Sequence, residues 1–252
     1  MSFEAAAVLY EMIYLDNAAT TRPDEEAVGE ALRFLREDFF NPSALYKESF
    51  AVHKRLDAAR KNILSHVADP AQFELVFTSC GSEADNQALF SGARRGNFVT
   101  TEGEHAAIYQ SAQELSRRGI DVRFAKLDRF GRADEADVLR LVDEKTSLVS
   151  VIHVNNETGA LLNVERFAAA VRAMAPNALI HIDGVQGYLR VPLSLKNVDM
   201  YTLSGHKLHG PKGIGALVVR KGVRLLPRQM GGGQERDLRS GTENTPGIAG
   251  LH

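Results

Sequence analysis

The stretch Ser147–Asp183, SLVSVIHVNNETGALLNVERFAAAVRAMAPNALIHID, carries the pattern from which the fold can be predicted. Its two ends, Ser147–Val154 and Ala178–Asp183, are nearly continuous apolar runs, which are typical of strands covered on both faces. Between them, Val164–Met174 repeats apolar residues with the period of a helix. A strand, a helix and a second strand in this order predict a βαβ unit with parallel strands.

The same alternation continues on both sides of this unit. Further strands are predicted at Glu74–Thr78, Asn97–Thr101, Val122–Leu127, Asp199–Ser204 and Ile214–Val219. Helices are predicted at Asp24–Glu37, Ser49–Val67, Ser82–Arg94 and Glu104–Arg117. The stretch from Gly231 onward is polar and glycine-rich, and we expect no helix there. The pattern predicts an α/β protein with a mostly parallel sheet.

Composition narrows the class of protein. The chain has 252 residues, with 30 basic and 32 acidic ones, and this balance argues against binding to nucleic acid or to anionic lipid. We find no apolar run of about 18 residues, and the first sixteen residues contain no Lys or Arg, so we expect neither a membrane helix nor a secretion signal but a cytoplasmic protein. The one cysteine, Cys80, excludes an intrachain disulfide and a cysteine-based metal cluster, and no metal site is predicted.

A candidate nucleophile follows the predicted strand that ends at Ser204. Lys207 lies just past this strand, in a loop rich in glycine. Ligands bind in loops at strand ends of α/β sheets, and a desolvated lysine there can lose its proton and form a Schiff base. A single lysine is more often a solvated surface charge. The interpretation of Lys207 as a nucleophile therefore depends on the other candidate residues described below.

An acid and an amide follow the strand that ends at Asp183. The carboxyl of Asp183 should be partly buried and therefore needs a cationic partner. A protonated pyridine nitrogen would be such a partner, and the ring of a pyridoxal cofactor requires one to act as an electron sink. Gln186 lies three residues farther on. The alternative is that Asp183 only caps the following segment.

Small and polar residues follow three other strands. Thr78–Glu83 joins a strand to a helix, where backbone N–H groups can form an anion cup, although Ser82 could equally be an ordinary N-cap. His105 opens a helix, and a lone His is commonly structural. Asn156, beside Asn155, could hold a ring oxygen or a substrate carboxylate, or could belong to a simple turn. Together with Lys207, these residues give one constellation beyond the strand ends: a lysine, an acid for a ring nitrogen, a phosphate cup and amides, the groups that pyridoxal 5′-phosphate (PLP) would need.

Six motifs in the chain resemble a known family. They are Asp16–Thr21 (DNAATT), Asn41–Ser43 (NPS), Phe77–Asn86 (FTSCGSEADN), His153–Gly159 (HVNNETG), Ser204–Lys207 (SGHK) and Arg239–Asn244 (RSGTEN). From about Tyr14 to the last residue the chain resembles the cysteine desulfurases of the class V aminotransferase group. The resemblance implies the large domain of fold-type I PLP-dependent transferases, a mostly parallel mixed sheet sandwiched by helices. It places this PLP-binding domain at residues 21–252.

The resemblance also implies a role for each site residue. Lys207 and His105 are the candidate catalytic residues, Lys207 through its internal aldimine with PLP and His105 by stacking on the ring. Asp183 would pair with the pyridine nitrogen, Gln186 would bind the phenolic oxygen, and Asn156 would lie near that oxygen and the substrate carboxylate. The phosphate would be held by Gly81, Ser82, Ser204 and His206. Thr242 would reach the phosphate of the partner subunit.

The activity that the resemblance implies is conversion of L-cysteine to L-alanine by a homodimer. A separate cysteine on a mobile loop takes the sulfur as a persulfide, for a sulfur acceptor or scaffold protein in iron–sulfur cluster assembly. That cysteine and a C-terminal small domain follow the RSGTEN motif in the family, so we expect both to be missing here, residues 1–20 to lack their usual packing partner, and activity to be impaired. Cys80 is given no catalytic role. The alternatives are a selenocysteine lyase or another class V enzyme, and a non-catalytic dimerisation or scaffold module.

Overall fold

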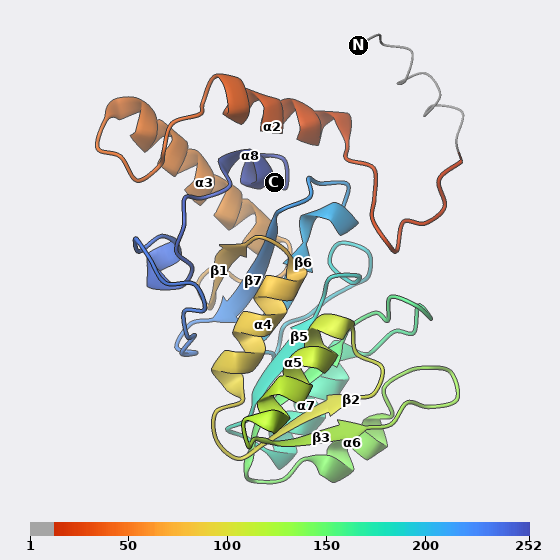
Figure 1. The fold of residues 1–252 in the computed structure, drawn as a ribbon. Helices are drawn as coiled ribbons and strands as arrows, with labels where there is room; N and C mark the ends of the chain where they lie inside the picture. The colour runs from red at the N-terminus through yellow and green to blue at the C-terminus, as the bar shows by residue number, and fades with distance from the viewer. Residues whose placement is uncertain (1–12) are drawn as a thin grey trace.

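The computed structural model describes residues 13–252, and these contain one seven-stranded sheet. Its strands are β1 (Phe73–Thr78), β2 (Asn97–Thr101), β3 (Asp121–Ala125), β4 (Thr146–Ile152), β5 (Leu179–Asp183), β6 (Met200–Ser204) and β7 (Gly215–Arg220). They lie in the order β1-β7-β6-β5-β4-β2-β3 (Figure 1). β7 runs antiparallel to β1 and β6, and the other neighbouring pairs are parallel. The predicted mostly parallel, mixed sheet is confirmed.

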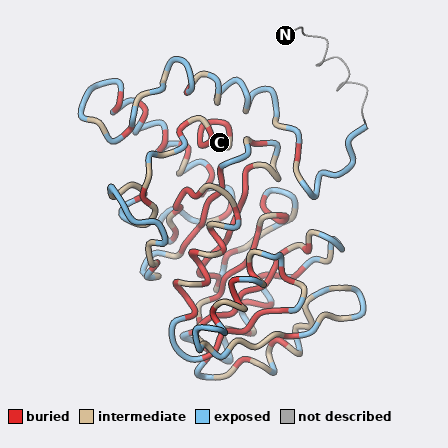
Figure 2. Tube along the Cα trace, in the orientation of Figure 1, coloured by how far each residue is buried: buried red, intermediate tan, exposed pale blue. Residues whose placement is uncertain are grey.

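Helices cover both faces of the sheet. They are α2 (Glu25–Arg36), α3 (Lys47–Ser65), α4 (Gly81–Gly92), α5 (Ala106–Arg117), α6 (Glu135–Leu141), α7 (Val164–Met174) and α8 (Thr245–Ala249), with short 3-10 turns η2 (Gly205–Lys207) and η3 (Glu235–Asp237). α4 and α5 share one apolar cluster with the sheet, and α3, α6 and α7 share the other. α2 packs on α8 at the edge of the molecule and is largely exposed (Figures 1 and 2).

The continuous apolar sequence of the inner strands is explained by these two clusters. Successive side chains of a strand point to opposite faces of the sheet. On β7, Ala216 and Val218 belong to the cluster of α3 and α7, whereas Leu217 and Val219 belong to the cluster of α4 and α5. Both faces are therefore buried, and no alternation of polar residues survives in the sequence.

The parallel arrangement brings the ends of several strands to one edge. β4, β5 and β6 are parallel neighbours and end at Ile152, Asp183 and Ser204. β1 is antiparallel to β7, as β6 is, so it ends at this edge too and leads into α4 at Gly81. The residues that follow these strands therefore meet, as expected for a ligand crevice in an α/β sheet.

The structure departs from the predictions mainly at short helices. All seven strands lie within a few residues of their predicted bounds, and α7 has the predicted bounds. α6 was not predicted, and the expectation of no helix after Gly231 was wrong. α8 begins there with Asn244 as N-cap, whose side chain accepts the Gly247 N–H, and Pro246 lies in the first turn. Helices of five and seven residues are too short to show a periodic pattern.

The predicted N-terminal segment, residues 1–20, lies partly outside the described residues. Within the described part, the chain near Thr21 packs against the loop that contains Lys207. The Thr21 N–H and hydroxyl donate to the carbonyl oxygen of His206 at 2.8 and 2.9 Å. Of the helices in residues 13–252, none is both long and apolar enough to cross a membrane.

Candidate active site

A cavity of about 470 Å³ opens where β4, β5 and β6 end and α4 begins. It is lined by all the predicted site residues except Thr242: Gly81, Ser82, His105, Asn156, Asp183, Gln186, Ser204, His206 and Lys207. These residues come from five separate loops and helix ends. The structure therefore brings together residues that are up to 126 positions apart in the sequence, from Gly81 to Lys207.

Lys207 lies at the end of η2 with its ammonium directed at backbone carbonyls. Nζ donates to the carbonyl oxygens of Ala18 and Ala19 at 2.5 and 2.7 Å. Partial burial lowers the pKa of Lys207, the Arg190 guanidinium lowers it further, and Asp16 and Asp183 oppose the shift. A lowered pKa makes the neutral, nucleophilic amine more accessible.

Asp183 ends β5 and is 2% exposed. Its Oδ1 accepts the Val185 N–H at 3.0 Å. Burial raises the pKa of Asp183, and the Val185 N–H, His105 and Lys207 oppose this shift. The carboxyl is therefore held in a place where a neighbouring cation would favour its charged form.

A second buried acid, Asp85 on α4, lies beside Asp183. Among residues 13–252 its Oδ1 has no hydrogen-bond partner, and ligand atoms of Asp85, His105 and Asp183 lie within 4.8 Å of one another. Burial, then the charge of Asp183, raises the pKa of Asp85 well above its usual value. This shift favours the neutral form of Asp85. Sequence reasoning quoted Asp85 in a motif but gave it no role, because only proximity to Asp183 distinguishes it.

The polar layer beneath Asp85 does not supply a charge. His181 is fully buried; its Nδ1 lies 2.8 Å from Ser150 Oγ and its Nε2 lies 3.0 Å from Thr202 Oγ1. Burial lowers the pKa of His181 to about 3, so the ring is neutral at pH 7. The 3.7 Å approach of His181 to Asp85 is therefore not an ion pair at neutral pH.

The start of α4 has the features of an anion site. Its N-cap is Cys80, which makes no capping bond through its side chain within the described residues. Ser82 therefore lies inside the helix, and the alternative that it is the N-cap is wrong. A Cβ built on Gly81 would lie 2.7 Å from Val185 Cγ2, so only glycine fits there. The N–H groups of the first turn remain available to an anion.

Glu83, also in the first turn of α4, is prevented from repelling such an anion. Its carboxylate accepts hydrogen bonds from the N–H and hydroxyl of Ser79 at 2.8 and 2.5 Å and from Arg239 Nε at 2.9 Å. These bonds lower the pKa of Glu83 against the effect of its partial burial. The RSGTEN motif thus neutralises an acid at the mouth of the cup.

His105 and Asn156 border the cavity from other loops. His105 caps α5, and its Nδ1 accepts the Ala107 N–H at 3.1 Å, which orients the ring. The side chain of Asn155 donates to the Gly103 carbonyl at 2.9 Å and closes the local turn, whereas Asn156 lines the cavity. Of two adjacent asparagines, one is structural and the other faces the site.

Gln186 and Arg190 form a connection that the sequence did not indicate. Gln186 Nε2 donates to the Ala18 carbonyl at 2.8 Å, and its Oε1 accepts from Arg190 Nη1 at 2.7 Å. Arg190 Nη2 donates to the carbonyl oxygen of Lys207 at 2.5 Å. Arg190 is outside every motif singled out above, so only the structure relates it to the site.

Two residues need separate mention. Thr242 is exposed, in the segment before α8, and does not line the cavity in the described part of the chain. Its contact with a partner subunit stays a prediction. Cys80 lines the cavity and is half-buried, and its sulfur lies 3.7 Å from Ser79 Oγ.

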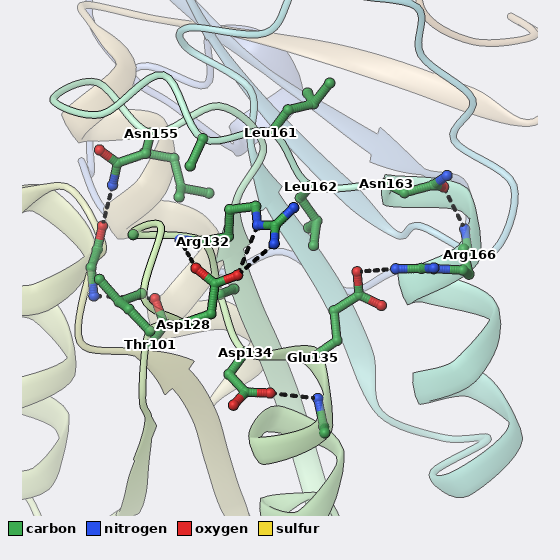
Figure 3. Close-up of a pocket in the computed structure, with 17 residues that line it drawn as sticks. Thr101, Asp128, Arg132, Asp134, Glu135, Asn155, Leu161, Leu162, Asn163 and Arg166 are labelled. Carbon is green, nitrogen blue, oxygen red and sulfur yellow. Dashed lines mark hydrogen bonds and ion pairs between the residues drawn. The ribbon is translucent and has the colours of Figure 1, made fainter.

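Figure 3 shows a second cavity, of about 470 Å³. It shares the lining residue Ile152 with the first cavity. Four of its charged side chains form two ion pairs, Arg132 with Asp128 at 2.8 Å and Arg166 with Glu135 at 2.6 Å, and Asp134 accepts backbone N–H groups as the N-cap of α6. These pairs leave little unsatisfied charge for a ligand. The chemically active groups lie in the first cavity.

Comparison with known proteins agrees with this geometry. The family model for aminotransferase class-V matches residues 13–252. Relatives include Cysteine desulfurase 2 of Trichormus variabilis, 41% identical over 246 residues, and Cysteine desulfurase NifS of Azotobacter vinelandii, 40% identical over 245 residues. Each match covers 95% of this chain but only 61% or 60% of the relative, so the chain spans about three fifths of their length.

Solved structures of similar proteins superpose closely on this chain. A NifS-like protein superposes with a TM-score of 0.90 at 37% identity, over 95% of this chain and 67% of that one. A structure described as SspA in complex with cysteine superposes with a TM-score of 0.89 at 32% identity, over 95% of this chain and 71% of that one. From the motifs, the fold and the extent of the match, we conclude that this chain belongs to the aminotransferase class-V family.

Proposed function

We propose that this chain binds PLP through Lys207 and forms the cofactor-binding part of a cysteine desulfurase. The observation that carries the proposal is the meeting of three features in one cavity. These are a lysine with a lowered pKa, a buried carboxyl at Asp183, and the uncapped N-terminus of α4 at Gly81.

The residues present fit the three reactive parts of PLP. Asp183 would hold the pyridine nitrogen, whose positive charge would favour the ionised form of its carboxyl, and burial favours the neutral form of the neighbouring Asp85. Gly81, Ser82, Ser204 and His206 would hold the phosphate, because all four line the cavity beside the N-terminus of α4. Gln186 and Asn156 would bind the phenolic oxygen, and His105 would cover the ring.

PLP, when bound, supplies an electron sink for the pair of electrons left on the substrate α-carbon. The chain's own residues orient and move protons around it. Lys207 can accept a proton at Nζ because burial and Arg190 lower its pKa. Asp183 is held by the Val185 N–H, so that it can support positive charge on the ring nitrogen.

We propose L-cysteine as the substrate and alanine as the product. The relatives' names and the solved structure in complex with cysteine support this choice. In the proposed reaction the thiolate of a separate cysteine attacks the substrate sulfur, and the bond between that sulfur and Cβ breaks. The electron pair of the broken bond stays with the substrate, which takes up a proton to give alanine. The attacking cysteine becomes a persulfide, whose outer sulfur is delivered to an acceptor in iron–sulfur cluster assembly. We assign Cys80 no such role, because it occupies the N-cap position of the helix whose first turn would hold the phosphate.

We further propose that the protein works as a homodimer, with Thr242 reaching the phosphate in the partner's cavity. Its exposure outside its own cavity supports this. The balanced charge supports the absence of a nucleic-acid partner.

Absorbance of the purified chain with added PLP tests the cofactor assignment. A band that borohydride makes permanent, with the modified peptide containing Lys207, is expected in the natural chain and not in Lys207→Ala. A folded natural chain with no band would contradict the proposal. Alanine formed from L-cysteine but not from L-selenocysteine would support the substrate, and the reverse preference would indicate a selenocysteine lyase.

A further inference from the structure

Arg190 connects two loops that the proposed function assigns to the cofactor. It follows the short turn after β5, and its guanidinium donates from Nη1 to Gln186 Oε1 at 2.7 Å and from Nη2 to the Lys207 carbonyl oxygen at 2.5 Å. One planar side chain therefore fixes the position of the loop that contains Gln186 relative to the loop that contains Lys207. A fork of this shape is specific to arginine, since an ammonium cannot donate two parallel bonds from a rigid plane.

The bond to Gln186 determines which way its amide points. The guanidinium only donates, so it must face the amide oxygen; the reversed amide would place N–H groups against N–H groups. Gln186 Nε2 is then directed to the Ala18 carbonyl, at 2.8 Å, beside the cavity. Gln186 can therefore act toward a ligand only as a hydrogen-bond donor, which matches an anionic oxygen and not a hydroxyl that must itself donate.

The bond to Lys207 acts on the lysine in two ways. It fixes the backbone of the residue whose Nζ lies between the Ala18 and Ala19 carbonyls. It also places a permanent positive charge near that ammonium. After burial, this charge is the next largest cause that lowers the pKa of Lys207, and Asp16 and Asp183 act against it. Arg190 is exposed, so solvent screens part of the effect.

We propose that Arg190 is a positioning residue of the PLP site: it presents Gln186 as a donor to the phenolic oxygen, and it fixes the backbone from which the Lys207 side chain enters the cavity. This inference rests on the proposed function, because it assumes that Lys207 is the lysine that PLP modifies. It does not require Arg190 to touch the cofactor.

The test compares Arg190→Lys and Arg190→Gln with the natural chain, with Arg118→Gln as the matched control. Arg118 is an exposed arginine paired with Glu114 at 2.8 Å on α5. Circular dichroism checks that each variant folds. The first readout is the pH dependence of Lys207 acylation in the chain without PLP, followed by peptide mass mapping. The second is PLP affinity, and the third is the pH midpoint of the absorbance of the bound cofactor.

Arg190→Gln removes both the charge and the fork. We expect Lys207 to titrate at higher pH and PLP to bind about tenfold more weakly, the usual cost of a lost charge-assisted hydrogen bond. Arg190→Lys keeps the charge, so Lys207 should titrate near the natural chain while PLP affinity still falls. Gln186→Glu should also weaken PLP binding, because its carboxylate can accept from Arg190 but cannot donate a hydrogen bond to the phenolic oxygen. Arg118→Gln should match the natural chain in all three readouts.

The outcomes separate this inference from the function on which it rests. If the natural chain binds PLP at Lys207 but Arg190→Gln leaves the lysine titration and the affinity unchanged, the inference is wrong and the proposed function stands. If the natural chain forms no linkage, the proposed function fails, and the acylation profile still shows whether Arg190 controls Lys207. If Arg190→Lys and Arg190→Gln change the lysine titration and the PLP affinity by equal amounts, the charge of Arg190 does not act on Lys207 separately from its hydrogen bonds, and that part of the inference is wrong.

Discussion

At the scale of single residues, burial decides the charge state of the acids near the site. Glu104 precedes His105, its Oε1 accepts from Thr101 Oγ1 at 2.6 Å, and its Oε2 has no partner within residues 13–252. Burial raises the pKa of Glu104 to about 8. Below pH 8 this side chain is therefore largely neutral in the folded chain, although it is ionised in the unfolded chain above about pH 4.5.

This difference predicts a pH-dependent effect of Glu104→Gln. A raised acid pKa stabilises the fold most below the unfolded pKa, and this contribution is lost as the pH rises from about 4.5 to about 8. The neutral amide has no such loss. Near pH 8 the free energy of unfolding of Glu104→Gln should therefore be about 1–3 kcal/mol larger than that of the natural chain. This difference should shrink toward pH 4.5. Urea unfolding at several pH values measures it, with exposed Glu144→Gln as control; a difference independent of pH would contradict the assignment.

At the scale of elements, one buried carboxylate holds a strained turn against the sheet. η3 contains Glu235, Arg236 and Asp237, all with positive φ, at 46°, 58° and 64°. Non-glycine residues in this region are costly and persist only where contacts hold them. Glu235 makes those contacts: it accepts from Arg60 at 2.7 and 2.8 Å and from the Phe77 N–H at 2.8 Å.

Removing one partner of this pair should be costly. Glu235→Ala leaves a half-buried Arg60 and the Phe77 N–H without their acceptor, and we expect a loss of about 3–5 kcal/mol in the free energy of unfolding. Arg60→Ala should cost a similar amount, and the double variant should cost less than the sum of the two. A double-mutant cycle in urea measures this coupling. Strictly additive losses would mean that the pair does not act as a unit.

At the scale of the whole molecule, the predicted dimer can be tested through Thr242. If Thr242 serves the partner's cavity, a Lys207→Ala chain and a Thr242→Ala chain are defective in different parts of each site. Their mixed dimer then contains one cavity with both residues intact. Unfolding and refolding the two variants together should restore about a quarter of the natural PLP binding (half of the dimers being mixed, each with one intact cavity), whereas each variant alone binds weakly. No recovery on mixing would place Thr242 outside the partner's site.

Much of this architecture is determined by local sequence. The strands are predicted by apolar runs such as Ser147–Val154, because a strand buried on both faces needs apolar side chains at every position. The nine cavity residues follow strand or helix ends that the sequence locates, and parallel strands bring those ends to one edge. Sequence therefore determines the sheet, its helices and the position of Lys207 and Asp183.

Only the tertiary structure decides which groups touch. Asn155 and Asn156 are adjacent residues of the same type, and no sequence pattern distinguishes them. In the structure Asn155 closes a turn, whereas Asn156 lines the cavity. Burial, and after it the charge of Asp183, 98 positions away, raises the pKa of Asp85. Arg190 joins Gln186 to Lys207 through the loops' mutual placement. The physical reason is that burial, hydrogen bonding and the resulting pKa values depend on distances between loops, and no local pattern of residues specifies those distances.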